Sequence, residues 1–578
     1  MEERRNAQGP VDGHPSGSPD NRPQECLQHQ GNLVTRREFL RWTGMGLAAA
    51  SVGGLGLLGG CSYFGGSDST EPSQTTTSLP ASTTVSTEAP TTSTTERSSG
   101  APVRGGTLRV GTIGGVPASI EPNAFLGHMT SNVIFYSLFD TLVKPTSGAT
   151  TFAWEMSLAE SVSMESPTAW TIRLREGATW HNGSPITVDD LIYSFRRALR
   201  PDSFASSMLL TIDRDNIETL PAPRGGTPNG IRLNLTAPDS MLIDSLWRIF
   251  IVPQGYDPAQ PIGSGPFKLQ SLAGDRCFLE RNDAYWGGAP YADRLAVYAY
   301  VEEGNRVSAL LGGGLDVAPM IDYAFADQVE ADASLSVLSY NSPMTYSLDM
   351  NVETQPLADN NIRQALRYAA DRPQLVEGVF GGRAQVANDL ICPADPNYAA
   401  DLPRIEYDPD RAKSLMDASG AADTIHLWSP ALAPGLRELA FAFVDQANAL
   451  GFDITPHKMS AGEYFGSRYP RLPMSNSFWL PEPLSVQVAL TQLPESRYNP
   501  TRFSDEVYAS LFRQARAEAD SSRRSELFAE MQRIAYERGA WIIPVTPNQV
   551  DAYSAQVGGA EPLPLLSYPE TAKLWLRG

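Results

Sequence analysis

The chain has 578 residues, of which 45 are Lys or Arg and 65 are Asp or Glu, so its formal net charge is −20. A chain this acidic is repelled by phosphate groups, which excludes nucleic acid as a partner. Its length is sufficient for two or three domains.

The first 60 residues have the pattern of an export signal. Arg36 and Arg37 precede an uncharged, Gly- and Ala-rich stretch from Trp42 to Gly60, which is typical of a twin-arginine signal. The stretch ends in Leu58-Gly59-Gly60-Cys61, which resembles a bacterial lipobox. We predict removal of residues 1–60 as a lipoprotein signal peptide and acylation of Cys61. The alternative is an uncleaved membrane helix, because the stretch is near the required ~20 residues.

Residues 61–104 are predicted to be a lipidated cysteine followed by a disordered tether. Ser, Thr, Pro and Gly dominate this segment, so it cannot bury enough apolar surface to fold. A coil of this length reaches about 35 Å. We therefore expect an exported protein anchored by lipid at the outer face of the cell membrane, at the cell surface or in the periplasm. Whether the tether carries sugar is left open.

Strands and helices alternate after the tether. Short strands are predicted at 107–111 and 170–174, and Asn182-Gly183 supplies a tight turn. Thr187 is predicted to begin a helix, with Asp190 as its capping-box partner. The apolar residues of that helix recur at a helical period, at Leu191, Ile192, Phe195 and Leu199.

The alternation continues to the C-terminus. Asp408 and Pro409 are predicted to open a helix that Gly420 ends, since Asp caps a helix, Pro fits its first turn and Gly ends it. Further predicted elements are a helix after Asn360, a helix at 436–450, a strand at 452–455, helices between 504 and 538, and a buried strand at 541–545 that ends at prolines. This pattern predicts an α/β fold.

Cysteines and histidines give no sign of a catalytic or metal centre. Cys26 falls in the discarded segment, while Cys277 and Cys392 leave a disulfide and two free thiols equally open. The sequence also contains no nucleophile with a base and no zinc-ligand spacing among His128, His181, His426 and His457. We expect no metal, no cofactor and no enzymatic activity, and an exported hydrolase is the less favoured alternative.

Several motifs, taken in order, resemble the bacterial extracellular solute-binding proteins of family 5, the oligopeptide, dipeptide and nickel group of ABC importers. The most specific runs from Trp170 to Asp190 and includes Arg175-Glu176-Gly177 and His181-Asn182-Gly183. The others are Gly263-Ser264-Gly265-Pro266-Phe267, Tyr285-Trp286-Gly287-Gly288, Asn361-Ile362-Arg363-Gln364-Ala365-Leu366 and Tyr407-Asp408-Pro409-Asp410-Arg411-Ala412-Lys413. In this context His181 belongs beside a hairpin turn, and the glycines around Ser264 suit a backbone crossing between domains.

The resemblance implies an α/β fold of the periplasmic-binding-protein type II class, with two lobes, a hinge and an extra small domain. Domain I would comprise 105–149, 250–325 and 541–578, domain II 150–249, and domain III 326–540. A small solute would bind in the cleft between the lobes, and the closed form would be read by the permease and ATPase subunits of an importer. We expect a monomer.

The resemblance also implies a peptide as the first candidate ligand. Peptide-binding members hold the ligand's ammonium with an aspartate in a pattern like the Trp479-Leu480-Pro481-Glu482-Pro483 stretch here. Trp479 stands at the aspartate position, so Glu482 becomes the candidate for the ammonium. Trp479 could stack on a ring, a sugar or a quaternary ammonium, and the alternatives are a solvent-facing Glu482 and a core Trp479.

Other candidate ligand-binding residues follow from position alone. Tyr346 and Asn351 lie on a strand predicted to enter domain III, Tyr136 and Glu121 lie near the first crossover, and Arg471 is the nearest cation to the Trp479 stretch. Asn351 could equally cap a turn, and Arg471 could lie in solvent. The alternative functions are a binding protein for a non-peptide polar solute (a sugar, an amine or a metal chelate) and a surface sensor.

Overall fold

The computed structural model describes residues 101–123, 129–223, 226–421, 423–469 and 471–577. The predicted signal peptide, Cys61, almost all of the tether, and His128 lie outside the described residues. Within the described ranges, no helix has both the length and the apolar character needed to cross a membrane.

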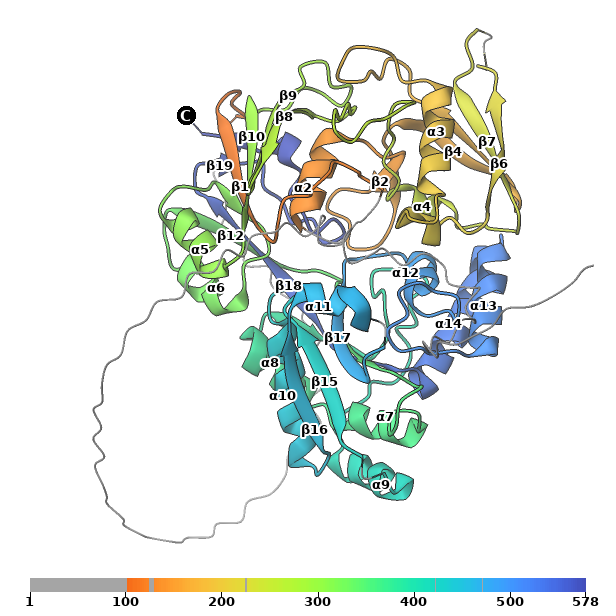
Figure 1. Cartoon of the computed structure of the whole chain (residues 1–578), viewed down its shortest axis with the longest axis vertical. Helices are drawn as coiled ribbons and strands as arrows, with labels where there is room; N and C mark the ends of the chain where they lie inside the picture. Colours follow the sequence, from red (N-terminus) through yellow and green to blue (C-terminus); the bar gives the residue numbers. More distant parts are fainter. Residues whose placement is uncertain (1–100, 124–128, 224–225, 422, 470, 578) are drawn as a thin grey trace, which may run out of the picture.

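Two lobes are joined by a strand that belongs to both (Figure 1). Strand β18 (Trp541–Ser554) has 14 residues. Its first half pairs with β13 (Thr345–Met350) and β14 (Ala384–Val386), and its second half with β11 (Val317–Ala318) and β12 (Leu335–Asn341). We call residues 101–341 and 548–577 the first lobe and residues 342–547 the second lobe.

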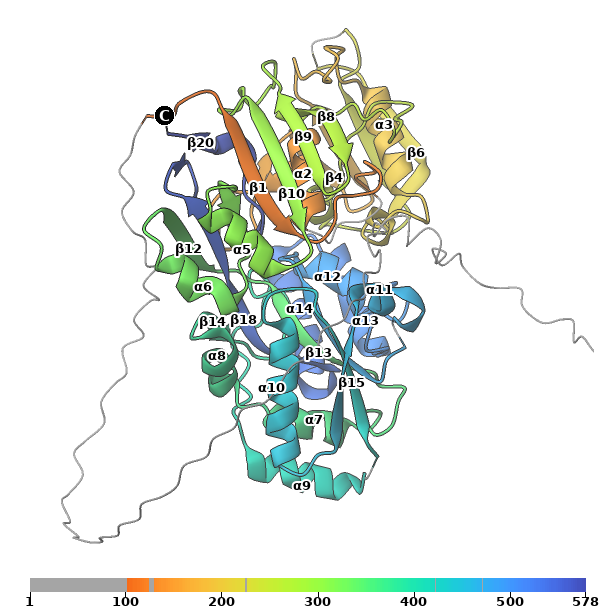
Figure 2. The ribbon, with the colours of Figure 1, turned by 60° about the vertical axis from the view of Figure 1, so that its left-hand side comes forward.

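The main sheet of the first lobe is built around β1, the strand predicted at 107–111. Leu108 and Val110 of β1 are buried, as the alternation requires. Figure 2 shows β1, β10, β9 and β8 side by side. The elements are β1 (Thr107–Ile113), α2 (Met129–Leu138), β8 (Phe267–Ala273), β9 (Arg276–Arg281), β10 (Arg294–Tyr300), α5 (Glu303–Leu311) and α6 (Tyr323–Glu330), with β19 (Val557–Gly558) and β20 (Trp575–Leu576) pairing near the C-terminus.

A separate four-stranded antiparallel sheet lies at the far side of the first lobe. Helix α3 (Val188–Ala198) contacts this sheet and buries Leu191 and Phe195. The predicted capping box is confirmed, because the Thr187 amide donates to Asp190 Oδ2 at 2.9 Å and the Asp190 amide donates to Thr187 Oγ1 at 3.4 Å. The strands are β4 (Ala159–Ser166), β5 (Ala169–Leu174), β6 (Ile212–Leu220) and β7 (Gly230–Leu235), and β2 (Val143–Pro145), β3 (Trp154–Met156) and α4 (Ile243–Leu246) lie nearby in the chain.

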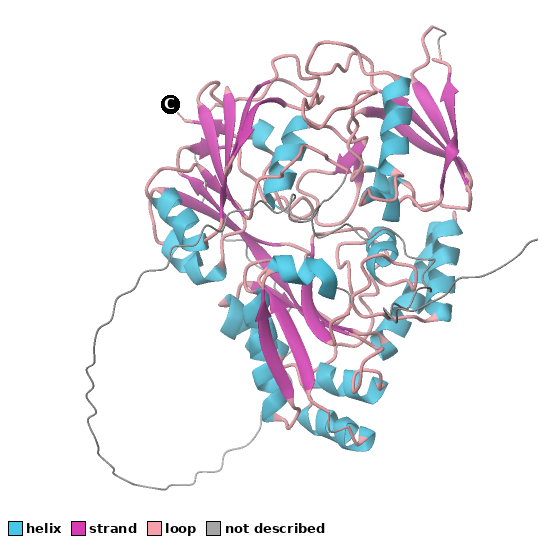
Figure 3. Cartoon of the chain, in the orientation of Figure 1, coloured by secondary structure: helices cyan, strands magenta, loops and turns pink. Residues whose placement is uncertain are grey.

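The second lobe places helices around strands in the order β16-β15-β17-β13 (Figure 3). Helix α9 (Pro409–Ser419) begins at the Asp408 cap and ends at Gly420 in the left-handed conformation, as predicted. The remaining elements are α7 (Asn360–Tyr368), α8 (Arg372–Phe380), β15 (Ile425–Pro430), α10 (Leu436–Ala449), β16 (Ile454–Met459), α11 (Ala461–Glu463), β17 (Met474–Trp479), α12 (Leu484–Thr491), α13 (Glu506–Ala517) and α14 (Ser521–Arg538).

The prediction that the last strand ends at prolines is wrong, since β18 continues through Pro544 and Pro547. Both prolines serve as acceptors: the Ala387 amide donates to the Pro544 carbonyl and the Ser342 amide to the Pro547 carbonyl. A proline lacks only the N–H, so it is tolerated where the strand changes partners.

The glycines around Ser264 cross the end of α2, which belongs to the same lobe, so this crossing is not the predicted one between domains. A Cβ at Gly263 would lie 1.9 Å from the Leu138 carbonyl oxygen, and one at Gly265 would lie 2.6 Å from the Leu138 carbonyl carbon. His181 contacts the same crossing, through its amide to the Gly263 carbonyl at 2.8 Å and its Nε2 to the Gly265 carbonyl at 3.1 Å. Burial lowers the pKa of His181 to about 4, so it is neutral at pH 7.

Cys277 and Cys392 are both free and buried. Cys277 lies on β9 of the first lobe and Cys392 lies in a loop of the second lobe, where its Sγ donates to Gln487 Oε1 at 3.0 Å. The alternative with two thiols is therefore the one that the structure contains.

A buried charge cluster supports the second lobe. Asp389 accepts hydrogen bonds from Arg372 Nη2 at 2.9 Å and from the Ile543 amide at 2.8 Å, and Arg367 Nε lies 3.6 Å from the same carboxylate. All three side chains are at most 2% exposed. The carboxylate thus joins α7, α8 and β18.

We expect Asp389→Ala to lower the free energy of unfolding by about 3–5 kcal/mol, because two buried guanidinium groups lose their anion. Urea unfolding followed by circular dichroism measures the change. Asp283→Ala is the matched control, since Asp283 is 75% exposed in its pair with Arg281 and should cost less than about 1 kcal/mol. Equal losses for the two variants would contradict the role of Asp389.

Candidate functional site

An ion pair crosses between the two lobes and is buried by both. Arg248 follows α4 in the first lobe, and Glu482 stands between Pro481 and Pro483 just before α12 in the second lobe. Arg248 Nη2 lies 2.6 Å from Glu482 Oε1, and the two side chains are 2% and 7% exposed. The pair thus marks the seam between the lobes.

Aromatic rings surround the guanidinium on the side of the first lobe. Arg248 lies over the Trp247 ring, 3.7 Å from its centroid. The Tyr136 hydroxyl donates to the Trp247 carbonyl at 3.3 Å, and the Tyr136 ring stacks on Tyr568 with centroids 4.4 Å apart. From the second lobe, Trp479 packs against the hydrophobic cores of both lobes. Flat, partly polar surfaces therefore line both sides of the seam.

Several buried polar side-chain atoms of residues along the seam have no hydrogen-bond partner among the described residues. We call Trp247, Arg248, Trp479, Glu482 and Gln487 the seam cluster. Its buried, unpartnered atoms are Trp247 Nε1, Arg248 Nε and Nη1, Trp479 Nε1, Gln487 Nε2 and Glu482 Oε2. Each such group costs about 1–3 kcal/mol when it is left unpaired. The five nitrogens all donate and the one oxygen accepts, so the seam suits a ligand group rich in acceptors together with one donor.

Burial sets the charge state of the cluster. It raises the pKa of Glu482, and the positive charge and hydrogen bond of Arg248 oppose that rise. It also raises the pKa of Tyr136, against the influence of Arg248 and with that of Glu482. The Tyr136 ring is therefore a neutral donor at the edge of a guanidinium–carboxylate pair.

Further polar contacts cross the seam beside the cluster. Arg516 of the second lobe forms an ion pair with buried Asp239, and Ser240 Oγ donates to the Arg516 carbonyl at 3.0 Å. Ser485 Oγ, in the first turn of α12, donates to Asp244 Oδ2 at 2.7 Å. Burial and the nearby Asp395 carboxylate raise the pKa of Asp244 to about 7. The closed seam thus buries more carboxylates than guanidinium groups.

The structure brings three of the predicted ligand-binding residues together. Trp479, Glu482 and Tyr136 all lie at the seam. Glu482 faces a buried cation from the other lobe, which differs from the solvent-facing alternative.

The other predicted site residues lie elsewhere. Glu121 pairs with Arg197, and Arg471 is exposed. Asn351 fixes a turn, because its Nδ2 donates to the Leu472 carbonyl and its Oδ1 accepts from the Glu353 amide. Tyr346 is buried in another hydrophobic cluster of the second lobe. Tyr346 and Asn351 were predicted from their place along one strand, and that place alone does not determine which of its side chains face the seam.

Arg248, Trp247 and Gln487 are not among the residues predicted for the site. Arg248 stands alone among apolar residues in the stretch from Leu246 to Val252. An isolated cation in a buried stretch needs a partner, so the sequence around Arg248 indicates a buried ion pair.

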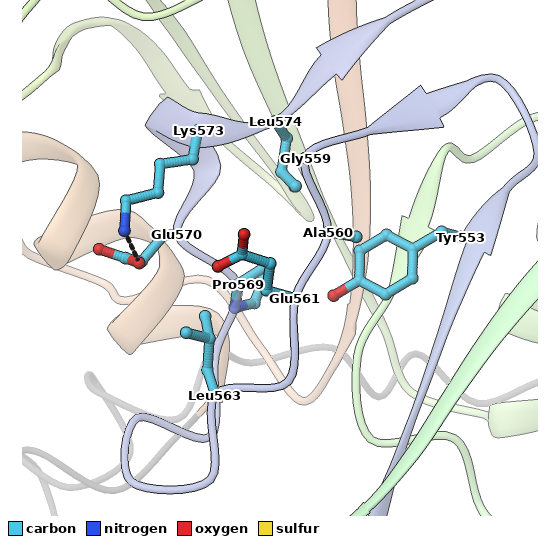
Figure 4. Close-up of a pocket in the computed structure, with 9 residues that line it drawn as sticks. All are labelled: Tyr553, Gly559, Ala560, Glu561, Leu563, Pro569, Glu570, Lys573 and Leu574. Carbon is cyan, nitrogen blue, oxygen red and sulfur yellow. Dashed lines mark hydrogen bonds and ion pairs between the residues drawn. The ribbon is translucent and has the colours of Figure 1, made fainter. Parts of the chain in front are cut away.

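Two cavities flank this part of the first lobe. One, shown in Figure 4, is lined by Glu561, Glu570 and Lys573 among others, and Lys573 Nζ pairs with Glu570 at 2.6 Å. The lining thus contains two carboxylates and one ammonium group. The second cavity is lined by Tyr136 and Tyr568, and the Tyr136 hydroxyl donates to the carbonyl of Trp247, a residue of the seam cluster.

We expect Asp244→Asn to flatten the pH dependence of stability between about pH 4 and pH 7. The pKa of Asp244 rises from 3.8 to about 7 on folding. Between these values the folded state holds a proton that the unfolded state releases, so this residue makes the wild type lose stability as pH rises. Urea unfolding at pH 5 and pH 8 should show a smaller difference in the free energy of unfolding for the variant.

Asp349, whose pKa is also raised to about 7, contributes the same pH dependence to the wild type and the variant. Parallel pH curves for the variant and the wild type would refute the assignment.

Comparisons with known proteins bear on the family and the fold of the chain. Residues 153–496 match the model of the bacterial extracellular solute-binding proteins, family 5. The dipeptide-binding protein of Escherichia coli is 24% identical over 470 residues, which cover 74% of this chain and 87% of that protein.

Solved structures show the same fold. Helicobacter pylori DppA, in complex with the peptide STSA, superposes with a TM-score of 0.72 at 19% identity over 82% of this chain and 99% of that one. Campylobacter jejuni NikZ, in complex with Ni(L-His), gives 0.72 at 18% identity over 81% and 99%. The predicted α/β fold of the type II periplasmic-binding-protein class is confirmed. The chain therefore belongs to family 5 of the bacterial extracellular solute-binding proteins.

Proposed function

We propose that the chain captures a small zwitterionic solute, with a peptide as the first candidate, at the seam and presents it to the permease and ATPase subunits of an ABC importer. The observation that carries this proposal is the set of buried, unpartnered polar atoms in the seam cluster. When the lobes close without a ligand, these atoms have no hydrogen-bond partner. A polar ligand would form hydrogen bonds with them and so offset the free-energy penalty of burying them.

The charges of the cluster suit the two ends of a short peptide. Arg248 has two nitrogens free for a carboxylate, and such charge-assisted bonds are about twice as strong as neutral ones. Glu482 has one carboxylate oxygen free to accept from an ammonium group. Glu482 would thus take the role of the aspartate that binds the ammonium group in peptide-binding members, since Trp479 stands at that position here. The indole N–H groups of Trp247 and Trp479 can donate to peptide carbonyls.

Closure follows from the division of the site between lobes. Arg248 and Trp247 come from the first lobe, and Trp479, Glu482 and Gln487 come from the second. A ligand that contacts both sets binds the closed form more tightly than the open one, so it shifts the population toward closure. The importer would recognise that closed form.

Relatives support a peptide but leave a second class of ligand. The Escherichia coli relative is named for dipeptide binding, and the Helicobacter pylori structure holds a peptide. The Campylobacter jejuni structure instead holds Ni(L-His), a metal chelate that carries a carboxylate. The excess of donors in the seam cluster favours such an acceptor-rich, non-peptide solute as the alternative.

We expect the double variant Arg248→Met/Glu482→Gln to bind the natural ligand at least about ten-fold more weakly, because it removes charge-assisted hydrogen bonds. Native mass spectrometry of material purified with its ligand identifies the molecule, and calorimetry then measures the affinity. Trp479→Phe, which removes one N–H and keeps an aromatic ring, should weaken binding less. Arg471→Met is the control, since Arg471 is exposed. Unchanged binding by the double variant would contradict the site.

Anchoring by lipid at Cys61 is part of the proposal and is tested separately. Cys61→Ser removes the thiol that would be acylated, so the protein should move from the membrane fraction to the soluble exported fraction. Cell fractionation followed by immunoblotting, with an antibody against the folded part of the chain, measures how the protein is distributed between the two fractions. Retention of the variant in the membrane would instead favour an uncleaved helix at 42–60.

A further inference from the structure

Two histidines far apart in the sequence meet on the outer strands of the second lobe. His426 lies on β15 and His457 on β16, which are parallel neighbours, and β16 is the edge strand of the sheet. Thr455 is opposite His426, and Trp428 is opposite His457, so both histidines point to the same face. His426 Nδ1 lies 3.0 Å from His457 Nε2, although the residues are 31 positions apart.

This separation matches two neighbouring ligands of one metal ion. Imidazole nitrogens bind divalent transition metals at about 2.0–2.1 Å. Two such nitrogens at right angles around a metal lie about 2.8–3.0 Å apart, whereas tetrahedral ligands lie about 3.3–3.4 Å apart. The pair therefore suits cis positions of a square-planar or tetragonal ion, the geometry typical of Cu²⁺ and Ni²⁺.

Neighbouring side chains fix the imidazole ring of His457, whereas the ring of His426 is exposed to solvent. His457 stacks on Trp428 with ring centroids 4.3 Å apart and planes 19° apart. The Arg468 guanidinium lies 4.7 Å from the centroid of the Trp428 ring, which fixes the indole in turn. His426 is exposed and His457 half-buried, so water can reach the remaining coordination positions. Arg468 is a nearby positive charge that opposes a bound cation.

A hydrogen bond between the two rings is the competing explanation of the same distance. Such a bond contributes only about 0.5–1.5 kcal/mol to stability, and in it the N–H of one ring donates to a nitrogen of the other ring. A metal ion uses both lone pairs, and the hydrogen on the donor nitrogen then moves to the other nitrogen of its ring, so no net proton is required. Affinity for imidazole sites rises from Ni²⁺ to Cu²⁺.

We propose that His426 and His457 form a surface site for one Cu²⁺ ion, with water completing the coordination and Ni²⁺ bound more weakly. The site lies on the edge of the second lobe and uses no residue of the seam cluster. It is therefore independent of the proposed solute capture.

The test is calorimetric titration of the full exported chain with CuCl₂ and NiCl₂ at pH 7.5, together with electron paramagnetic resonance of the copper complex. The wild type should bind one equivalent of Cu²⁺ that His426→Asn and His457→Asn each lose. Lys458→Asn is the matched control, because it changes the next residue of β16 on the opposite face and should retain that equivalent. The spectrum should show two coordinated imidazoles in the wild type and one at most in each histidine variant.

Trp428→Leu separates a built site from two chance neighbours. Removing the stacked indole frees the His457 ring, so copper should bind about ten-fold more weakly while circular dichroism stays unchanged. Equal copper binding by the wild type and His426→Asn would overturn the proposal and leave the pair as a hydrogen bond only. Because His426 is exposed, that variant gives a clear result even if Trp428→Leu fails to fold.

Discussion

Bringing the lobes together buries charged groups away from water. The stability of the closed form therefore depends on whether each of these groups has an oppositely charged partner. Arg248 and Glu482 neutralise each other across the seam, as do Arg516 and Asp239. Each ion taken from water carries a penalty of several kcal/mol that only a well-placed partner offsets. Neither pair can form unless both lobes are present and close, so these contacts tie the chemistry of the site to the relative position of the lobes.

A shared strand limits how the lobes can move. β18 pairs with strands of both lobes, so the sheet is continuous through the seam. Motion between lobes must bend or twist that strand near Pro547, where its partner changes from β14 to β12. Pro544 and Pro547 have no N–H to donate to the ladder there. A rotation about this region would separate Arg248 from Glu482 and would also part Val486 and Leu490 from the core of the first lobe. Hinge motion of this kind is typical of clefts that close on a ligand.

Local signals in the sequence predicted local structure well. The Thr187–Asp190 capping box and the Asp408 and Gly420 boundaries of α9 depend on contacts within a few residues, and they lie where predicted. The extent of β18 did not follow from its prolines, because tolerance of a proline depends on which partner strand lies opposite. The family motifs predicted the fold, since their order along the chain reflects the whole architecture.

The site was predictable only in part for the same reason. Glu482 was noticed because of its place in a family pattern, but its partner Arg248 lies 234 residues away in sequence. His426 and His457 show no ligand spacing along the chain, and only the register of β15 and β16 brings them together. Pairings of this kind depend on how distant segments meet, which periodicity and capping rules do not encode.

The prolines on either side of Glu482 have a consequence for the speed of uptake. With its neighbours restricted in φ, the Pro481-Glu482-Pro483 segment has little conformational freedom to lose when a solute arrives. Encounter then requires lobe rotation but no folding of this segment, so association can approach the limit set by diffusion and rotation.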